Sequence, residues 1–143
     1  MAEITLRKAR TIVRQALAKG REHEMKPLVV CVLDAGAHLK AFEREDGAAN
    51  MRFEVAHGKA HGALGLGMGS RALKARADAQ SYFILAVNGA FGGGLVPVPG
   101  GVLVRDRRGA LIGAVGISGD TGENDELAAI AGIEAAGFTA DPG

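Results

Sequence analysis

Apolar and polar residues follow each other along the first third of the chain with periods that predict one helix and one pair of strands. Over residues 5–23, apolar side chains recur every three or four positions and basic side chains fill the rest, which predicts an amphipathic helix capped by Thr5. The apolar run 28–34 predicts a strand covered on both faces. Residues 39–44 return beside it after a short turn, so we expect a β-hairpin.

The rest of the chain predicts more helices and a second hairpin. Residues 50–65 and 70–79 fit helices, residues 82–90 fit a helix or a strand, and residues 92–101, with two prolines, are irregular. Residues 102–105 and 110–117 form the second hairpin, and Thr121 caps a last helix that ends at Gly137. Tight hairpins with helices packed on them indicate an α+β fold, which we predict as one domain over residues 1–143.

Composition and charge narrow the classes of function. A net charge of +1 with only five Phe and one Tyr is untypical of nucleic-acid-binding proteins, which combine a basic surplus with stacking rings. No apolar run is long enough to span a membrane, and basic residues interrupt the N-terminus where an export signal would be apolar, so we expect a cytoplasmic protein. Cys31 is the single cysteine, which excludes an intrachain disulfide, and its apolar strand indicates a buried side chain.

Glycine is the unusual component, with 22 residues gathered mainly in the stretches 58–69, 89–101 and 109–122. Such clusters are typical either of close packing or of a ligand lying against the main chain, and both interpretations stand. The glycines at 92–94 and the bend Pro99-Gly100-Gly101 could turn several amides toward one point and bind an anion. We therefore predict a small-molecule ligand in a glycine-walled pocket.

The predicted helix 50–65 carries two neighbouring arcs of different chemistry. One arc is apolar and should face the core, with Phe53, Ala56, Ala60, Ala63 and Leu64. Glu54, His57 and His61 share the next arc, where they could bind a divalent metal, or one imidazole could bind haem iron. A solvated polar face or a subunit contact explains the same pattern without a ligand.

Three charged residues are candidates for proton transfer. Lys59 lies at the edge of the alanine-rich arc, where it could orient an anion or act as a base, although a lysine that extends its ammonium into water explains the position equally. Asp125 and Glu126 lie at the start of the last helix, where the helix dipole favours acidic side chains. Either of them could instead pair with Lys59 or bind a cation.

Four stretches and an acidic pair occur in a specific order, namely VLDAGAHLKAF at 32–42, AHGKA at 56–60, PVPGG at 97–101, IGAVGISG at 112–119, and Asp125-Glu126. Together they resemble the GlcG/HbpS family, which includes the C-terminal domain of PduO-type proteins. The resemblance implies a profilin-like fold, a five-stranded antiparallel sheet flanked by helices, assembled as a homo-oligomer of two to eight copies. It also implies that Lys59, the bend 99–101 and the acidic pair belong to the site.

The resemblance and the residues favour a protein that binds haem or a related cofactor. His57 or His61 would supply the axial ligand, and Phe53 and Phe91 would line the slot with Leu95. Some family members contact haem through a threonine at a position that is Gly62 here, so these histidines would be specific to this chain.

Two alternatives remain open. In the first, the protein is an enzyme of catabolism that acts on a small organic acid or aromatic compound, with Lys59 as the anion-orienting residue or base and Asp125 or Glu126 transferring protons. Gly100 and Gly101 would then bind the substrate carboxylate. In the second, the chain is a structural or regulatory subunit without an enclosed pocket.

Overall fold

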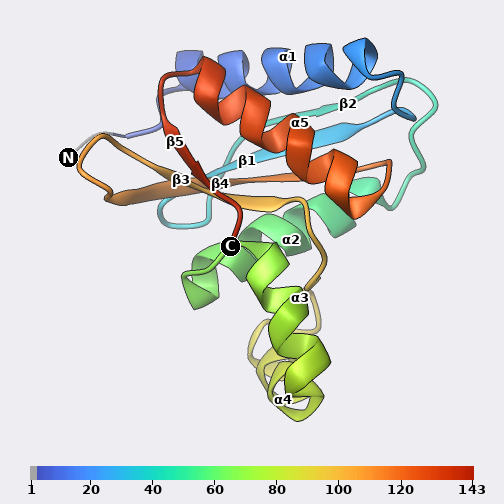
Figure 1. The fold of residues 1–143 in the computed structure, drawn as a ribbon, viewed down its shortest axis with the longest axis vertical. Helices are drawn as coiled ribbons and strands as arrows, with labels where there is room; N and C mark the ends of the chain where they lie inside the picture. Colours follow the sequence, from blue (N-terminus) through green and yellow to red (C-terminus); the bar gives the residue numbers. More distant parts are fainter. Residues whose placement is uncertain (1–2) are drawn as a thin grey trace.

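The computed structural model describes residues 3–143, in which a five-stranded sheet lies between helices (Figure 1). The strands are arranged in the order β2-β1-β4-β3-β5, and every neighbouring pair is antiparallel. The predicted α+β fold with a five-stranded antiparallel sheet is therefore confirmed. In chain order the elements are α1 (Leu6–Glu22), β1 (Val29–Asp34), β2 (Leu39–Arg44), α2 (Arg52–Leu66), α3 (Ser70–Ala79), α4 (Ser81–Ala90), β3 (Gly101–Arg105), β4 (Leu111–Ser118), α5 (Gly122–Ala135) and β5 (Thr139–Asp141).

Helices α1 and α5 cover one face of the sheet. Both begin as predicted, because Thr5 accepts a hydrogen bond from the Lys8 amide and Thr121 accepts one from the Asn124 amide. Their apolar sides bury a large core with alternate residues of the strands, which include Val30, Val32, Val102, Val104, Val115 and Ile117. The amphipathic pattern of α1 and the alternation in the strands thus determine this layer.

Helix α2 covers the opposite face and lies unusually close to the sheet. Its residues Ala56, Ala60 and Ala63 are fully buried, as the apolar arc predicted. Gly116 lies beneath them in the central strand β4, where a Cβ atom would overlap the carbonyl oxygen of Ala56. Because small residues occupy both the buried side of α2 and the facing strand β4, the backbone of the helix lies directly on the strand. This close approach lets polar side chains of α2 reach the end of β4.

Helices α3 and α4 form a hairpin that projects away from the sheet (Figure 1). The hairpin has a small apolar cluster of its own around Leu73, Ile84 and Leu95. The segment whose pattern fitted a helix or a strand is therefore a helix, and Ile84 is its single buried residue. An apolar run of this length cannot be assigned from its pattern alone, and here the packing against α3 decides.

Three further details complete the fold. The pattern along the chain did not predict the three-residue strand β5. This strand pairs with β3, and an ion pair between Arg105 and Asp141 joins the two strands. Cys31 is buried as predicted, and burial raises the pKa of its thiol to about 12. Within residues 3–143, no helix combines the length and the hydropathy that crossing a membrane requires.

Candidate functional site

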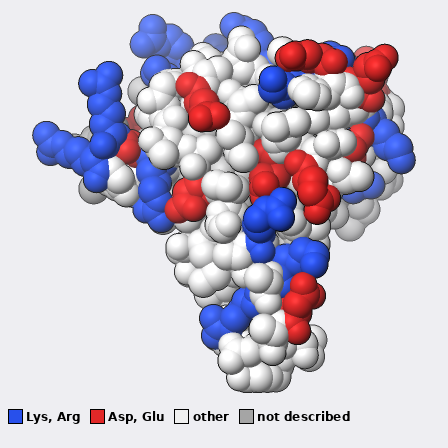
Figure 2. Space-filling model, viewed as in Figure 1, with Lys and Arg blue, Asp and Glu red and all other residues white. Residues whose placement is uncertain are grey.

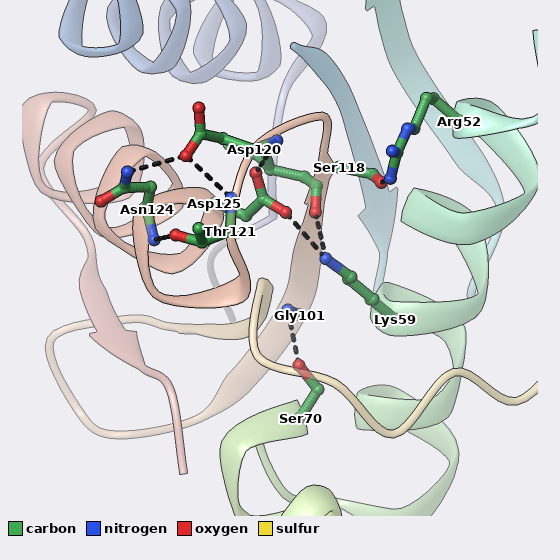
Figure 3. Close-up of polar contacts among 10 residues, drawn as sticks. Arg52, Lys59, Ser70, Gly101, Ser118, Asp120, Thr121, Asn124 and Asp125 are labelled. Carbon is green, nitrogen blue, oxygen red and sulfur yellow. Dashed lines mark hydrogen bonds and ion pairs between the residues drawn. The ribbon is translucent and has the colours of Figure 1, made fainter. Parts of the chain in front are cut away.

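Lys59 extends from the middle of α2 to the end of β4, where its ammonium group is buried (Figure 3). Lys59 Nζ donates hydrogen bonds to the carbonyl oxygen of Ile117 at 2.9 Å and to Asp125 Oδ2 at 3.0 Å. The side chains of Lys59 and Asp125 are 3% and 2% exposed. Of the alternatives that the sequence left open, the structure shows the pairing of Lys59 with Asp125, and the interpretation with the ammonium in water is wrong.

The loop that precedes α5 holds the other oxygen of the Asp125 carboxyl. Asp125 Oδ1 accepts a hydrogen bond from the amide of Asp120 at 2.9 Å. Burial lowers the pKa of Lys59 and raises the pKa of Asp125, because each charge loses hydration, while their mutual attraction opposes both shifts. Each group therefore depends on its partner, and the pair ties α2 to α5.

The bend at residues 99–101 closes over this pair. Gly100 has a φ of +124°, and a Cβ atom there would lie 2.8 Å from Lys59 Nζ. A Cβ atom on Gly101 would overlap the main chain of Lys59, and the Gly101 amide donates a hydrogen bond of 2.7 Å to Ser70 Oγ. The bend packs directly on α2, so Pro99, Gly100 and Gly101 do not form one wall of an open pocket with Lys59.

The same close packing continues along α2. Gly58, Gly62 and Gly65 face the segment after α4, where added Cβ atoms would overlap Gly94, Leu95 and Phe91, respectively. Among the hollows on residues 3–143, five were compared with this region, and none of these five is lined by Lys59, Asp125 or the bend 99–101. Of the two interpretations of the glycine clusters, these contacts favour close packing, and the glycine-walled pocket stays a prediction.

Glu126 lies apart from Lys59, although it follows Asp125 in the sequence. Its carboxylate forms a two-pronged ion pair with Arg71 of α3, with Arg71 Nε 3.0 Å from Oε2 and Arg71 Nη2 3.1 Å from Oε1. Successive residues of a helix point about 100° apart. The structure therefore brings Asp125 to Lys59 and directs Glu126 toward the hairpin.

Five aromatic rings form a row along α2, next to the side of the helix that packs against the segment after α4. Ring centroids are 4.9 Å apart for Phe42 and Phe53, 5.6 Å for Phe53 and His57, 5.4 Å for His57 and His61, and 5.1 Å for His61 and Phe91. All five side chains are half-buried. We call this set the α2 ring row.

Two elements and one connecting segment build the α2 ring row. Phe53, His57 and His61 belong to α2, whereas Phe42 comes from β2 and Phe91 follows α4. Four of these residues were predicted from the sequence as parts of a site, whereas Phe42 was not. The alternation of β2 could have revealed it, because every second residue of that strand faces α2.

His57 differs in its electrostatics from a free imidazole. The pKa of His57 is lowered, first by burial and second by the nearby His61. A neutral imidazole keeps a lone pair on one nitrogen, as a metal ligand requires. Glu54 is exposed, and within residues 3–143 no group of three His, Cys, Asp or Glu side chains could hold a metal ion. The divalent-metal hypothesis for Glu54, His57 and His61 thus stays a prediction, whereas a single axial imidazole fits the row.

Comparisons with known proteins agree on one family. The family model described as haem degrading protein HbpS-like matches residues 4–134. PduOC, solved in complex with heme, is 25% identical with a TM-score of 0.85 over 96% of this chain and 97% of its own. HbpS is 25% identical with a TM-score of 0.78 over 92% and 89%. Protein ORFY of Klebsiella pneumoniae is 24% identical with a TM-score of 0.84 over 96% and 93%. No curated protein matches the chain.

Proposed function

The chain belongs to the family of HbpS-like haem degrading proteins, and from this premise we propose that it binds haem, or a related flat tetrapyrrole, on the α2 ring row. One observation carries the proposal, namely that two half-buried imidazoles lie within an unbroken row of aromatic rings. The likeness to PduOC over nearly the whole of both chains supports it, because that protein was solved in complex with heme.

The chemistry of the row suits such a ligand. A tetrapyrrole presents a wide apolar face, which gains from contact with aromatic rings, and its iron takes an imidazole as axial ligand. His57 and His61 lie one helical turn apart on the same side of α2, so either imidazole, but not both, would hold the iron. His57 is the better ligand, because it lies at the centre of the row and its lowered pKa keeps it neutral.

Titration of the purified protein with hemin tests this proposal. The wild type should give a sharp Soret band, His57→Ala should shift or abolish it, and His61→Ala should perturb it less. The matched control is His38→Ala, because His38 is exposed in a turn outside the row. If the His57→Ala and His61→Ala variants both keep the wild-type spectrum and affinity, the row does not bind the iron.

The alternative, an enzyme that uses Lys59 as a base, has less support. Lys59 is 2% exposed and both of its hydrogen-bond partners belong to the protein, so a substrate would first have to displace the bend at 99–101. Asp125 is buried to the same degree, and Glu126 forms an ion pair with Arg71. A structural role for the Lys59–Asp125 pair accounts for these contacts without a reaction.

A further inference from the structure

A hollow of about 470 Å³ opens at the end of the β3–β4 hairpin. It is lined by residues 106–108 of the hairpin turn, by residues 136–138 between α5 and β5, and by Lys8 of α1. Its volume lies within the range of small-molecule sites. We call it the hairpin hollow.

The hairpin hollow contains three cations and one carboxylate. Lys8, Arg107 and Arg108 carry positive charge and Asp106 carries negative charge, which leaves a surplus of two positive charges. Within residues 3–143, none of the three cations forms an ion pair with an acidic side chain. Figure 2 shows Lys and Arg side chains gathered at this end of the hairpin, at the left of the view. A hollow with such a surplus attracts an anion.

Asp106 shapes the hairpin turn. Its Oδ1 accepts hydrogen bonds of 2.9 Å from the amides of Arg108 and Ala110. The Gly109 amide donates a hydrogen bond of 3.0 Å to the Asp106 carbonyl oxygen, and Gly109 has a φ of +82°. The backbone of Arg107 and Arg108 is therefore fixed by the turn itself, which lowers the entropy lost when a ligand binds.

Lys8 is fixed by the end of α5. Lys8 Nζ donates a hydrogen bond of 2.7 Å to the carbonyl oxygen of Ala136 and lies 5.7 Å from the centre of the Phe138 ring. An ammonium group has three N–H donors, so this bond leaves two for a ligand. Phe138 is half-buried and gives the hairpin hollow an aromatic wall.

These groups fit a phosphate monoester better than a carboxylate. A carboxylate has one negative charge and pairs with one guanidinium group, whereas a phosphate monoester has about two negative charges and three acceptor oxygens near pH 7. Two guanidinium groups and an ammonium group can donate to all three oxygens. We propose that the hairpin hollow binds a small phosphate monoester with an apolar body. The phosphate would lie on Arg107, Arg108 and Lys8, and the body on Phe138.

The proposal is independent of haem binding. The hairpin hollow lies on the side of the sheet that α1 and α5 cover, whereas the α2 ring row lies on the opposite side. A failure of one proposal therefore leaves the other standing, since hemin binding is read from a spectrum and phosphate binding from a heat.

Isothermal titration calorimetry with phenyl phosphate at low salt tests the site. The wild type should bind one molecule per chain with a Kd below about 1 mM, and the double variant R107A/R108A should bind about tenfold or more weakly. The matched control is R10A/R14A, which removes two exposed arginines of α1 that line a different hollow. Both double variants lose the same charge, so a specific site predicts that only R107A/R108A loses the affinity.

Two simpler anions test which parts of the ligand are recognised. Inorganic phosphate keeps the phosphate without the apolar body, and benzoate keeps the ring with a single charge. Each should bind at least about threefold more weakly than phenyl phosphate, because each lacks one of the two contacts.

The amide signals in two-dimensional NMR spectra locate the site without any variant. Addition of phenyl phosphate should shift the amide signals of Arg108, Gly109 and Gly137. The amide signals of His57 and His61, on the opposite side of the sheet, should stay unchanged.

Four results would overturn the proposal. The first is the absence of saturable binding up to about 10 mM phenyl phosphate. The second is a loss of affinity in R107A/R108A no greater than that in R10A/R14A, which would indicate a general attraction to positive charge. The third is benzoate or inorganic phosphate that binds as tightly as phenyl phosphate. The fourth is a set of shifted amide signals that excludes the hairpin hollow.

Discussion

Lys59 Nζ of α2 lies 3.0 Å from Asp125 Oδ2 of α5, in an ion pair of which both side chains are buried. Helices α2 and α5 cover opposite faces of the sheet, so the pair joins the two helical layers at the end of β4 (Figures 1 and 3). The bond spans 66 positions of sequence. It holds the helix that carries the α2 ring row in a fixed position on the sheet.

Removal of one partner of this pair should destabilise the fold strongly. Lys59→Met would leave the Asp125 carboxyl buried without its cation, and the expected loss in the free energy of unfolding is about 3–5 kcal/mol. Urea denaturation followed by circular dichroism measures it.

The double variant K59M/D125N is the control for that experiment. It removes both charges, so it should lose less stability than the sum of the two single variants. If the double variant loses as much free energy of unfolding as the two single variants together, the two groups are not coupled in solution. That result would contradict the buried ion pair.

Gly116 should not tolerate even one added methyl group. A Cβ atom there would overlap the Ala56 carbonyl, so Gly116→Ala would force α2 away from β4 at an expected cost of about 1–3 kcal/mol. Gly94→Ala is the matched control, since its Cβ would have an ordinary contact of 3.6 Å with the Phe91 carbonyl. Equal melting temperatures for the two variants would contradict the close approach of α2 to the sheet.

The proposed binding of haem should depend on pH in a definite direction. A protonated imidazole cannot bind iron, and the pKa of His57 is lowered from 6.5. The affinity for hemin should therefore stay level above pH 6.5 and fall by up to about tenfold per pH unit below the pKa of His57. Hemin titrations between pH 8 and pH 5 measure this, and a decline that begins above pH 7 would indicate a different ligand.

Asp120 should contribute to stability only above acidic pH. Its carboxylate accepts hydrogen bonds of 2.8 Å from the amides of Lys26 and Thr121 and from the Asn124 side chain, and they lower its pKa from 3.8 to about 2. A carboxyl group with a lower pKa in the folded chain stabilises the fold above its unfolded pKa. This contribution is lost as the pH falls from about 4 to about 2.

Urea denaturation of Asp120→Asn against the wild type checks the direction. The wild type should be the more stable protein at pH 6, and the difference should shrink toward pH 2. A difference that is the same at both pH values would show that the charge of Asp120 does not matter.

The local elements were predictable because each depends on residues close together in sequence. The spacing of apolar residues predicted α1 and α2, the threonine caps predicted where α1 and α5 begin, and the turns predicted both hairpins. The pattern on α2 also separated its alanine arc from the arc of Glu54, His57 and His61, because both arcs follow from 3.6 residues per turn.

Contacts between distant segments could not be derived in this way. The sequence left Lys59 free to face water, a ligand or an acid, and the decision came from Asp125, which only the meeting of α2 and α5 brings within reach. In the same way, only the fold brought residues 91–96 into contact with Gly58, Gly62 and Gly65 and placed Phe91 beside His61. A periodic pattern states which face of an element is apolar, but it does not state which element covers that face, and tertiary packing alone made that choice.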